Sequence, residues 1–401
     1  MISSPNRPRP VRIPPGSPRI ASSAPKRSIS LPVIAPTVAP ERAPQPPADI
    51  AHGDPFSQYK ILNHFEHLQA VARGENVLPI TVEIDPTNRC NHRCQWCVSM
   101  ESHTGEMLDV DRFALLIDEL HDSGVRSVVL KGGGESSTHP CFNDMLDILR
   151  RADLSTGLIT NGSLPRAGSL EKVLECCEWV RVSLDAATAQ THHLIHGTTD
   201  FAKITQNIAY LTGHSTRTMV GLNFVAEPRN CHEMVSFARL GKSLGVAYVT
   251  IRCVFDPANP LPSEIRDTLR DQAIEAKRLD DGQFRVFLGN FTDRYLNADR
   301  HQPFPYRRCL GPNLIGIVGG DSHVYACCFL RGNRQFSFGS LEEQSFAEIW
   351  NGPRRQEVME AVYRGDCRRV CAGGMTANRY NTYNEILNYL ATEEKPHSTF
   401  A

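Results

Sequence analysis

The sequence lacks three features, and each absence excludes a class of protein. It has no long apolar run: the longest, such as residues 251–255, are interrupted by charge, and a membrane helix needs about 20 apolar residues. It has no excess of one charge, since 43 basic residues nearly balance 44 acidic ones, so we expect no nucleic-acid partner. It begins without the basic and then apolar segments of a signal peptide, so we expect a cytoplasmic protein without membrane contact.

Cysteine, in contrast, is abundant. The chain has 13 cysteines, an odd number at uneven spacing. Because the cytoplasm keeps thiols reduced, clustered cysteines there are more often metal ligands or catalytic groups than disulfides. The composition therefore excludes a small disulfide scaffold and directs attention to metal-binding or catalytic cysteines.

The N-terminal region differs from the rest of the chain. Residues 1–50 contain 13 of the 27 prolines, seven basic residues and two acidic ones. Proline at this density prevents helices and sheet ladders, so the pattern predicts a disordered tail with polyproline character. Residues 51–78 are predicted to form a helical lead-in, because apolar side chains between residues 56 and 72 recur with the period of an amphipathic helix.

Strand-like and helix-like segments then alternate, which predicts an α/β fold with a parallel sheet and right-handed crossovers. Six strands are too few for the usual closed eight-stranded barrel, so a partial (β/α)6 TIM-like barrel or a doubly wound sheet remains. The predicted strands are 80–85, 127–131, 156–160, 180–185, 219–225 and 247–253. The predicted helices are 110–121, 143–152, 170–176, 204–211 and 234–244.

Charged side chains at alternate strand positions favour the barrel. Glu83 and Asp85 share one face of the first strand, and Arg181 and Asp185 share one face of the fourth. A sheet face covered by helices would not hold such charges. We therefore expect this face to line a cavity filled by a ligand, where Glu83 and Asp185 would suit a substrate that carries an amino group.

The first chemical motif follows the first strand. Cys90, Cys94 and Cys97 have the spacing C-x3-C-x2-C. Three thiolates this close can hold one cubane iron–sulfur cluster and leave one iron open for another ligand. The alternative is a structural zinc site, for which His92 would be the fourth ligand.

The second motif is the sequence Lys-Gly-Gly-Gly-Glu at 131–135, directly after the second strand. Glycines without a Cβ let the backbone approach a ligand closely. Since the chain lacks both the Walker ending and G-x-G-x-x-G here, a phosphate site is not indicated.

Together the two motifs resemble those of the radical S-adenosylmethionine (radical SAM) superfamily, over about residues 78–255. The resemblance implies that Cys90, Cys94 and Cys97 bind a [4Fe-4S] cluster, that SAM chelates its open iron, and that a flavodoxin- or ferredoxin-type donor reduces it. The cleaved SAM would yield a 5'-deoxyadenosyl radical that abstracts hydrogen from substrate. The implied SAM contacts are Gly133, Gly134 and Glu135 for the methionyl amino group, Trp96 near adenine, and Ser183, Asn223 and Arg252 for ribose and carboxylate.

The C-terminal region contains cysteines at 309, 327, 328, 367 and 371. With these it resembles the SPASM/twitch extension of the same superfamily, a small α+β iron–sulfur domain. The resemblance implies one auxiliary [4Fe-4S] cluster, because no cysteine follows Cys371. Cys328 could replace Cys327, which we prefer because it stands three residues after Val324. Four spaced cysteines could instead hold zinc. The implied cluster ligands are Cys309, Cys327, Cys367 and Cys371.

These patterns predict a core domain at 79–300, an auxiliary cluster domain at 301–376 and a C-terminal helix and tail at 377–401. His192, His193 and His196 are interpreted as solvated or capping residues. No single catalytic side chain is assigned.

The substrate is predicted less directly. Because no N-terminal leader-binding domain is evident, the sequence favours oxidation or epimerisation of a small sugar or aminocyclitol in natural-product biosynthesis. The first alternative is a maturase that modifies a ribosomal peptide. Alternatives of another class are a zinc-stabilised binding protein and a redox scaffold without radical chemistry.

Overall fold

The protein is described here from a computed structural model. The chain divides into two units, Met1–Asp54 and Pro55–Ala401, and every observation below concerns the second. The predicted tail at 1–50 lies outside the described residues, and the predicted domain boundaries stay predictions. The structure describes residues 57–94, 96–97, 99, 103–253, 262–289, 306–368, 371 and 379–392.

One ten-stranded sheet organises this unit, in the order β10-β9-β8-β1-β2-β3-β4-β5-β6-β7. Strands β1 to β7 are parallel, β8 also runs parallel to β1, and β9 and β10 add antiparallel pairs. The strands are β1 Thr81–Ile84, β2 Ser127–Leu130, β3 Ser155–Thr160, β4 Trp179–Ser183, β5 Met219–Ala226, β6 Tyr248–Cys253, β7 Arg285–Gly289, β8 Ile315–Val318, β9 His323–Tyr325 and β10 Ser337–Ser340.

The strand and helix alternation confirms the predicted fold class, with one addition. The parallel core has a seventh strand, β7, which the sequence analysis missed, and β8 continues the same sheet from the C-terminal region. Among the described strands, β10 and β7 stand at the two edges, so the sheet is open, as a partial barrel requires.

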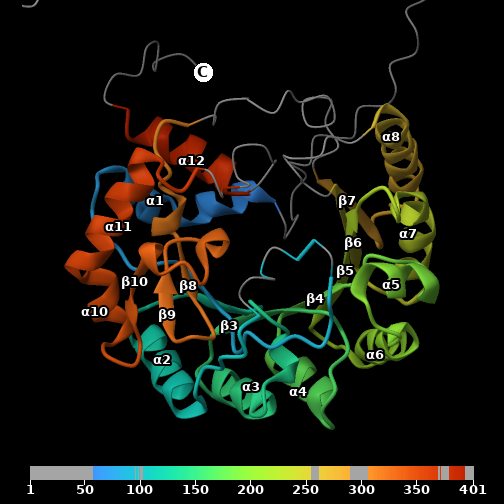
Figure 1. The fold of residues 1–401 in the computed structure, drawn as a ribbon, viewed down its shortest axis with the longest axis horizontal. Coiled ribbons are helices and arrows are strands. Elements are labelled where there is room, and N and C mark those ends of the chain that lie inside the picture. The colour runs from blue at the N-terminus through green and yellow to red at the C-terminus, as the bar shows by residue number, and fades with distance from the viewer. Residues whose placement is uncertain are drawn as a thin grey trace, which may run out of the picture. The chain divides into compact units, whose positions relative to one another are not determined.

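Helices cover the outer side of the parallel strands, where Figure 1 shows α2, α3, α4, α6, α7 and α8 following one another around the sheet. None of the helices in the described ranges combines the length and apolarity that a membrane span requires. The α-helices are α1 Phe65–Ala72, α2 Val110–Asp122, α3 Phe142–Arg151, α4 Ser169–Cys176, α5 Ala189–His196, α6 Phe201–His214, α7 Met234–Ser243, α8 Ser263–Lys277, α10 Phe346–Asn351, α11 Pro353–Arg364 and α12 Arg379–Leu390.

Helix α2 illustrates why these segments fold as they do. The Asp109 side chain caps it by accepting hydrogen bonds from the backbone N–H groups of Asp111 and Arg112. Its apolar side chains recur at the spacing of one helix face and are fully buried. These side chains are Phe113, Leu116, Ile117 and Leu120.

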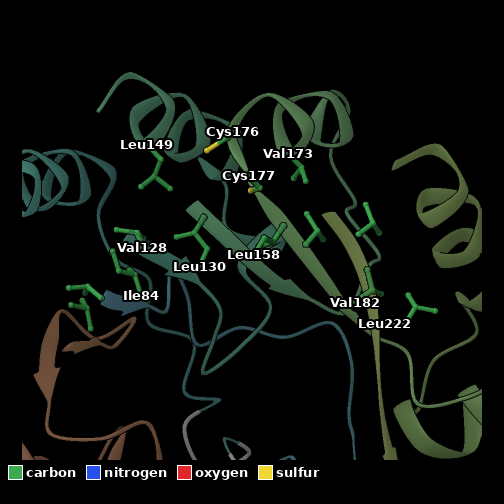
Figure 2. Close-up of a cluster of buried hydrophobic side chains, with 14 of the residues drawn as sticks. Ile84, Val128, Leu130, Leu149, Leu158, Val173, Cys176, Cys177, Val182 and Leu222 are labelled. Carbon is green, nitrogen blue, oxygen red and sulfur yellow. The ribbon is translucent and has the colours of Figure 1, made fainter. Parts of the chain in front are cut away.

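The core lies between these helices and the sheet (Figure 2). Alternate residues of β2 and β4 are buried, and the residues between them are half-buried. In Figure 2, Leu149 of α3 and Val173 of α4 lie over the same cluster as Leu130 and Leu158 of the sheet. The opposite sheet face, with Arg181 and the other polar positions, therefore lines the interior, as the alternation predicts.

The C-terminal segment is joined to the first α/β unit of the barrel. Strand β8 pairs with β1, and α10 packs against α2. The Arg112 Nε donates to the Leu341 carbonyl at 2.6 Å, and the Phe346 backbone N–H donates to the Glu119 carboxylate at 2.7 Å. Helix α12 packs against α1 beside this segment (Figure 1).

Candidate functional site

The three cysteines of the first motif lie in the loop after β1 and are partly buried. Burial, with smaller contributions from Glu135 and Cys97, raises the pKa of the Cys90 thiol to about 11, although the hydrogen bond from the His92 backbone opposes the change. Burial, followed by Asp185, Cys97 and Cys90, also raises the pKa of Cys94. Thiols that oppose ionisation in this way stay protonated on their own, and they become thiolates when a bound metal displaces the proton.

The structure answers the question of a fourth protein ligand. Both ring nitrogens of His92 have partners: Nδ1 lies 3.3 Å from His196 Nδ1, and Nε2 lies 3.1 Å from the Asp200 carboxylate. The His92 backbone N–H lies 3.4 Å from Cys90 Sγ, and the ligand atoms of His92, Cys94 and His196 lie within 4.8 Å of one another. Both nitrogens of the candidate zinc ligand thus have other partners, and the three cysteines suit a cluster held by three thiolates with one open iron.

The glycine loop after β2 packs directly against this cysteine loop. The Gly134 backbone N–H donates to the Thr87 carbonyl, and the Glu135 N–H donates to the Arg89 carbonyl. A Cβ on Gly134 would stand 2.0 Å from the Arg89 carbonyl oxygen, so only glycine permits this approach. The two sequence motifs therefore form one structural unit.

The Glu135 side chain connects the glycine loop to the end of β3 through hydrogen bonds. Its carboxylate accepts bonds from the Ser137 N–H and hydroxyl, the Thr160 hydroxyl at 2.7 Å and the Asn161 N–H at 2.7 Å. Three of these donors share Oε1 and one bonds to Oε2, so Oε2 keeps one acceptor position. The predicted contact of Glu135 with SAM stays a prediction, and Gly132 and Gly134 are the partly exposed parts of the loop. Asn161 lies at the end of this network of hydrogen bonds.

The three interior polar candidates lie on adjacent strands. Ser183 of β4 pairs with Asn223 of β5, and Arg252 of β6 pairs with Val225, two residues beyond Asn223. All three therefore share the interior face at the carboxyl ends of their strands. Trp96 of the cysteine loop lies with its ring centroid 5.8 Å from the Arg229 guanidinium, beyond the end of β5.

The interior acids already have partners. Glu83 Oε2 lies 2.5 Å from Lys131 Nζ, and Asp185 Oδ1 accepts a 2.7 Å bond from the Val225 N–H. This weakens the expectation that Glu83 and Asp185 bind a substrate amino group, because both carboxylates are compensated within the protein.

Asp85 forms the least expected pair. Its buried carboxylate lies 2.6 Å from Arg331 Nε, and Arg331 belongs to the C-terminal segment. Burial raises the pKa of Asp85 to about 6, although Arg331 and Lys131 oppose the change. Arg331 also lies 3.5 Å from the Ser99 hydroxyl, just beyond Cys97. Sequence reasoning missed this residue, because no local pattern relates positions so far apart in the chain.

The second set of cysteines gathers around Cys309. Burial raises the pKa of Cys309 to about 12, and Cys371 and Cys367 add to the effect. The thiols of Cys327 and Cys328 are hydrogen-bonded to each other; beyond that contact, Cys327 is influenced by Cys309, whereas Cys328 is influenced by Lys131, Glu83 and Arg331 of the interior. This arrangement supports the choice of Cys327 as the ligand. Helix α12 holds the first ligand in place, since Asn384 accepts from the Leu310 and Gly311 N–H groups.

A cavity of about 700 Å³ opens beside the cysteine loop. Its volume falls in the range of sites that bind cofactors and other ligands. Its lining is rich in cationic and imidazole groups and includes Arg89, Cys90, His92, Arg93 and His103.

Two family models match the chain. The radical SAM superfamily matches residues 84–237, and the SPASM iron–sulfur cluster-binding domain matches residues 309–373. The chain therefore belongs to the radical SAM superfamily and carries a C-terminal SPASM domain. It is an enzyme that uses SAM, a [4Fe-4S] cluster and an auxiliary iron–sulfur centre, and the zinc-stabilised binding protein and the inactive scaffold are not supported.

Individual relatives span most of the chain. A tungsten-containing aldehyde ferredoxin oxidoreductase cofactor-modifying protein of Pyrococcus furiosus is 26% identical over 68% of this chain and 80% of its own length. The bacteriocin subtilosin biosynthesis protein AlbA of Bacillus subtilis is 23% identical over 81% and 78%. The mycofactocin maturase MftC of Mycobacterium ulcerans is 25% identical over 80% and 88%.

Solved structures show the same fold. Streptococcus suis SuiB superposes with a TM-score of 0.57 at 13% identity, over 75% of this chain and 73% of SuiB. The enzyme anSMEcpe with bound SAM superposes with a TM-score of 0.55 at 15% identity, over 78% and 96%.

Proposed function

We propose that this enzyme is a maturase that oxidatively modifies a peptide. The observation that carries the proposal is the recurrence of peptide modification among relatives that span both the core and the SPASM region. MftC is named a maturase, another relative is a PqqA peptide cyclase, and AlbA serves bacteriocin biosynthesis. This favours the alternative of the sequence analysis over its first choice, a small sugar or aminocyclitol.

The first choice depended on the absence of a recognisable leader-binding domain. That argument is weak on physical grounds, because hydrogen abstraction needs only the reacting side chain inside the barrel. The rest of a peptide can be held at the barrel mouth or by another chain. The relatives therefore outweigh that argument as evidence for the substrate class.

The residues have the following proposed roles. The cluster that binds SAM is held by Cys90, Cys94 and Cys97. The cluster and SAM together would supply the 5'-deoxyadenosyl radical that abstracts hydrogen. Ser183, Asn223 and Arg252 orient SAM from three adjacent strands, and Trp96 flanks its adenine. A flavodoxin- or ferredoxin-type protein supplies the electron.

The second cysteine set is proposed to hold the auxiliary cluster near the substrate. A cluster held there would take up the electron left on the substrate once a hydrogen atom has gone to the radical and a proton to solvent, which would make the net reaction a two-electron oxidation. Its proposed ligands are Cys309, Cys327, Cys367 and Cys371.

The experiment compares substrate classes in the anaerobically reconstituted enzyme. Short peptides encoded beside this gene and a panel of aminocyclitols are each incubated with SAM and dithionite. We expect a peptide to increase 5'-deoxyadenosine formation and to lose a pair of hydrogen masses in the mass spectrum. Stimulation by an aminocyclitol alone, with every peptide unchanged, would contradict the proposal. In a Cys309→Ala variant, peptide-dependent 5'-deoxyadenosine should persist while the oxidised peptide disappears.

A further inference from the structure

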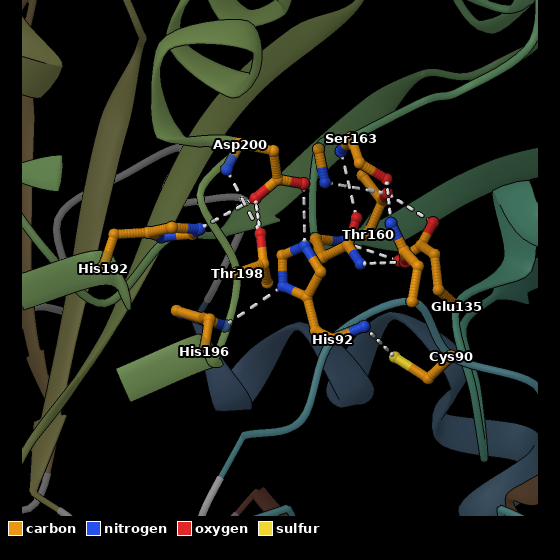
Figure 3. A network of polar contacts seen from close by, with 12 residues as sticks. Cys90, His92, Glu135, Thr160, Ser163, His192, His196, Thr198 and Asp200 are labelled. Carbon is orange, nitrogen blue, oxygen red and sulfur yellow. Dashed lines mark hydrogen bonds and ion pairs between the residues drawn. The ribbon is translucent and has the colours of Figure 1, made fainter. Parts of the chain in front are cut away.

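A cluster of buried histidines lies against the SAM-cluster loop on the side of Cys94. The sequence analysis interpreted His192 and His196 as solvated or capping residues, and the structure contradicts this for both, which are 0% and 1% exposed. Only His193 of the three is exposed. Helix α5 supplies two of the rings and the cysteine loop supplies His92, and Figure 3 shows them converging with Asp200.

One nitrogen of this cluster lies against a cysteine. His196 Nδ1 lies 3.0 Å from Cys94 Sγ and 3.3 Å from His92 Nδ1. The other nitrogen, Nε2, lies 3.0 Å from the Leu184 carbonyl oxygen and 3.3 Å from the Asp185 carboxylate. The ring is therefore fixed at both ends, between the fourth strand and the cysteine loop.

The partners determine where the protons lie. The Leu184 carbonyl and the Asp185 carboxylate only accept, so His196 Nε2 carries a proton. His92 Nε2 and His192 Nε2 both lie 3.1 Å from Asp200 oxygens and donate to them, which leaves His92 Nδ1 as an acceptor. His196 Nδ1 thus faces two groups that accept once Cys94 is a metal-bound thiolate. A hydrogen on His196 Nδ1, directed at Cys94 Sγ, satisfies both acceptors.

We infer that His196 donates an N–H···S hydrogen bond to Cys94 and thereby raises the reduction potential of the SAM-binding cluster. The inference rests on the proposed role of Cys94 as a cluster ligand. Hydrogen bonds to ligand sulfur stabilise the reduced, more negative cluster, so they are one of the means by which proteins set its potential. His196 is a positioning residue in this account, and His92, His192 and Asp200 hold its ring in orientation.

A purely structural role explains less of the geometry. The His192 and His196 rings stack with centroids 4.6 Å apart, so packing accounts for their burial. Packing alone does not require a nitrogen directed at a cysteine sulfur, and the two accounts differ in what they predict for the potential.

The test uses two polar substitutions of similar size in the full-length, anaerobically reconstituted enzyme. His196→Asn keeps an amide N–H near the Nδ1 position, and His196→Gln keeps one near Nε2 but removes the donor to Cys94. The potential is measured by redox titration of the electron paramagnetic resonance signal that SAM shifts. His193→Asn is the matched control on the exposed face of the same helix.

We expect His196→Gln to lower the reduced-to-oxidised ratio about tenfold at a given potential, a shift of about 59 mV for one electron. His196→Asn and His193→Asn should titrate close to the wild type. A wild-type potential in His196→Gln, or an equal shift in His196→Asn, would overturn the inference. A separate Cys94→Ala variant tests the proposed role of Cys94 as a cluster ligand. If the signal that SAM shifts is still observed in this variant, Cys94 is not a ligand and the proposed site itself is wrong.

Discussion

The adjacent residues Cys327 and Cys328 interact with each other but differ in their other neighbours. Cys327 is also influenced by Cys309, whereas Cys328 is influenced by Lys131 and Glu83 of the barrel interior. Spacing along the chain cannot separate two consecutive candidates, but their neighbours in the fold can.

This difference predicts unequal effects of substitution. Cys327→Ala should remove the auxiliary cluster and lower the iron content by about four atoms per chain, because a cubane needs its ligand set. Cys328→Ala should keep the full iron content. Iron and sulfide analysis after anaerobic reconstitution distinguishes the variants. Loss of iron in Cys328→Ala alone would show that Cys328, and not Cys327, is the cluster ligand.

Individual residues also show which parts of the site can be predicted from the sequence. Cys90, Cys94 and Cys97 were identifiable because metal ligation imposes a short local spacing. Arg331 and His196 were not, since their importance arises from partners about 100 or more positions away, Asp85 and Cys94, that only the fold brings close. The His192 and His196 pair resembled an exposed helix end in sequence, and its burial depends on Asp200 and the cysteine loop.

At the scale of elements, the site depends on the contact between two loops. The glycine loop after β2 donates two backbone hydrogen bonds to the cysteine loop after β1. Neither loop has this conformation from its own sequence alone, so a substitution in one loop should change the conformation of the other.

Two neighbouring glycines test this dependence. A Cβ on Gly134 would collide with the Arg89 backbone at 2.0 Å, whereas one on Gly133 would meet the end of the Asn88 side chain at 2.5 Å, which can move. Gly134→Ala should therefore displace the cysteine loop and abolish the SAM-binding cluster in a folded protein. Gly133→Ala should keep most of it. Cluster absorbance together with circular dichroism provides the measurement, and equal cluster loss in both variants would contradict this account.

The strand β7 was not predicted from the sequence, and the reason can be identified. Period-two patterns between apolar and polar residues located six strands, but β7 spans only Arg285–Gly289, with one buried position. A short edge strand with little burial has no strong pattern. Its place is set by pairing with β6, a tertiary effect.

At the scale of the whole described unit, the ion pair between Asp85 and Arg331 connects the SPASM region to the barrel. Asp85 follows β1 immediately before the cysteine loop, and both side chains are at least nine-tenths buried. The pair therefore joins the residue before the cysteine loop to the segment after Cys327 and Cys328, and strand β8 reinforces the same junction by pairing with β1.

Breaking this pair should be costly. Arg331→Met leaves a buried carboxylate without its partner and is expected to lower the free energy of unfolding by about 3–5 kcal/mol. Adding Asp85→Asn should restore a large part of that loss. Urea unfolding followed by circular dichroism measures both, with Arg354→Met as control, since the Arg354 and Glu357 pair is exposed. An Arg331→Met variant as stable as the control would refute the importance of the junction.

The central claim is that three thiolates after β1 hold a cluster whose open iron binds SAM for reductive cleavage. The most direct measurement compares the wild type with a Cys90/Cys94/Cys97 triple alanine variant, anaerobically, with SAM and dithionite. The account predicts about eight irons per chain falling to about four, and 5'-deoxyadenosine formed by the wild type alone. A triple variant that keeps its iron or still produces 5'-deoxyadenosine would contradict it.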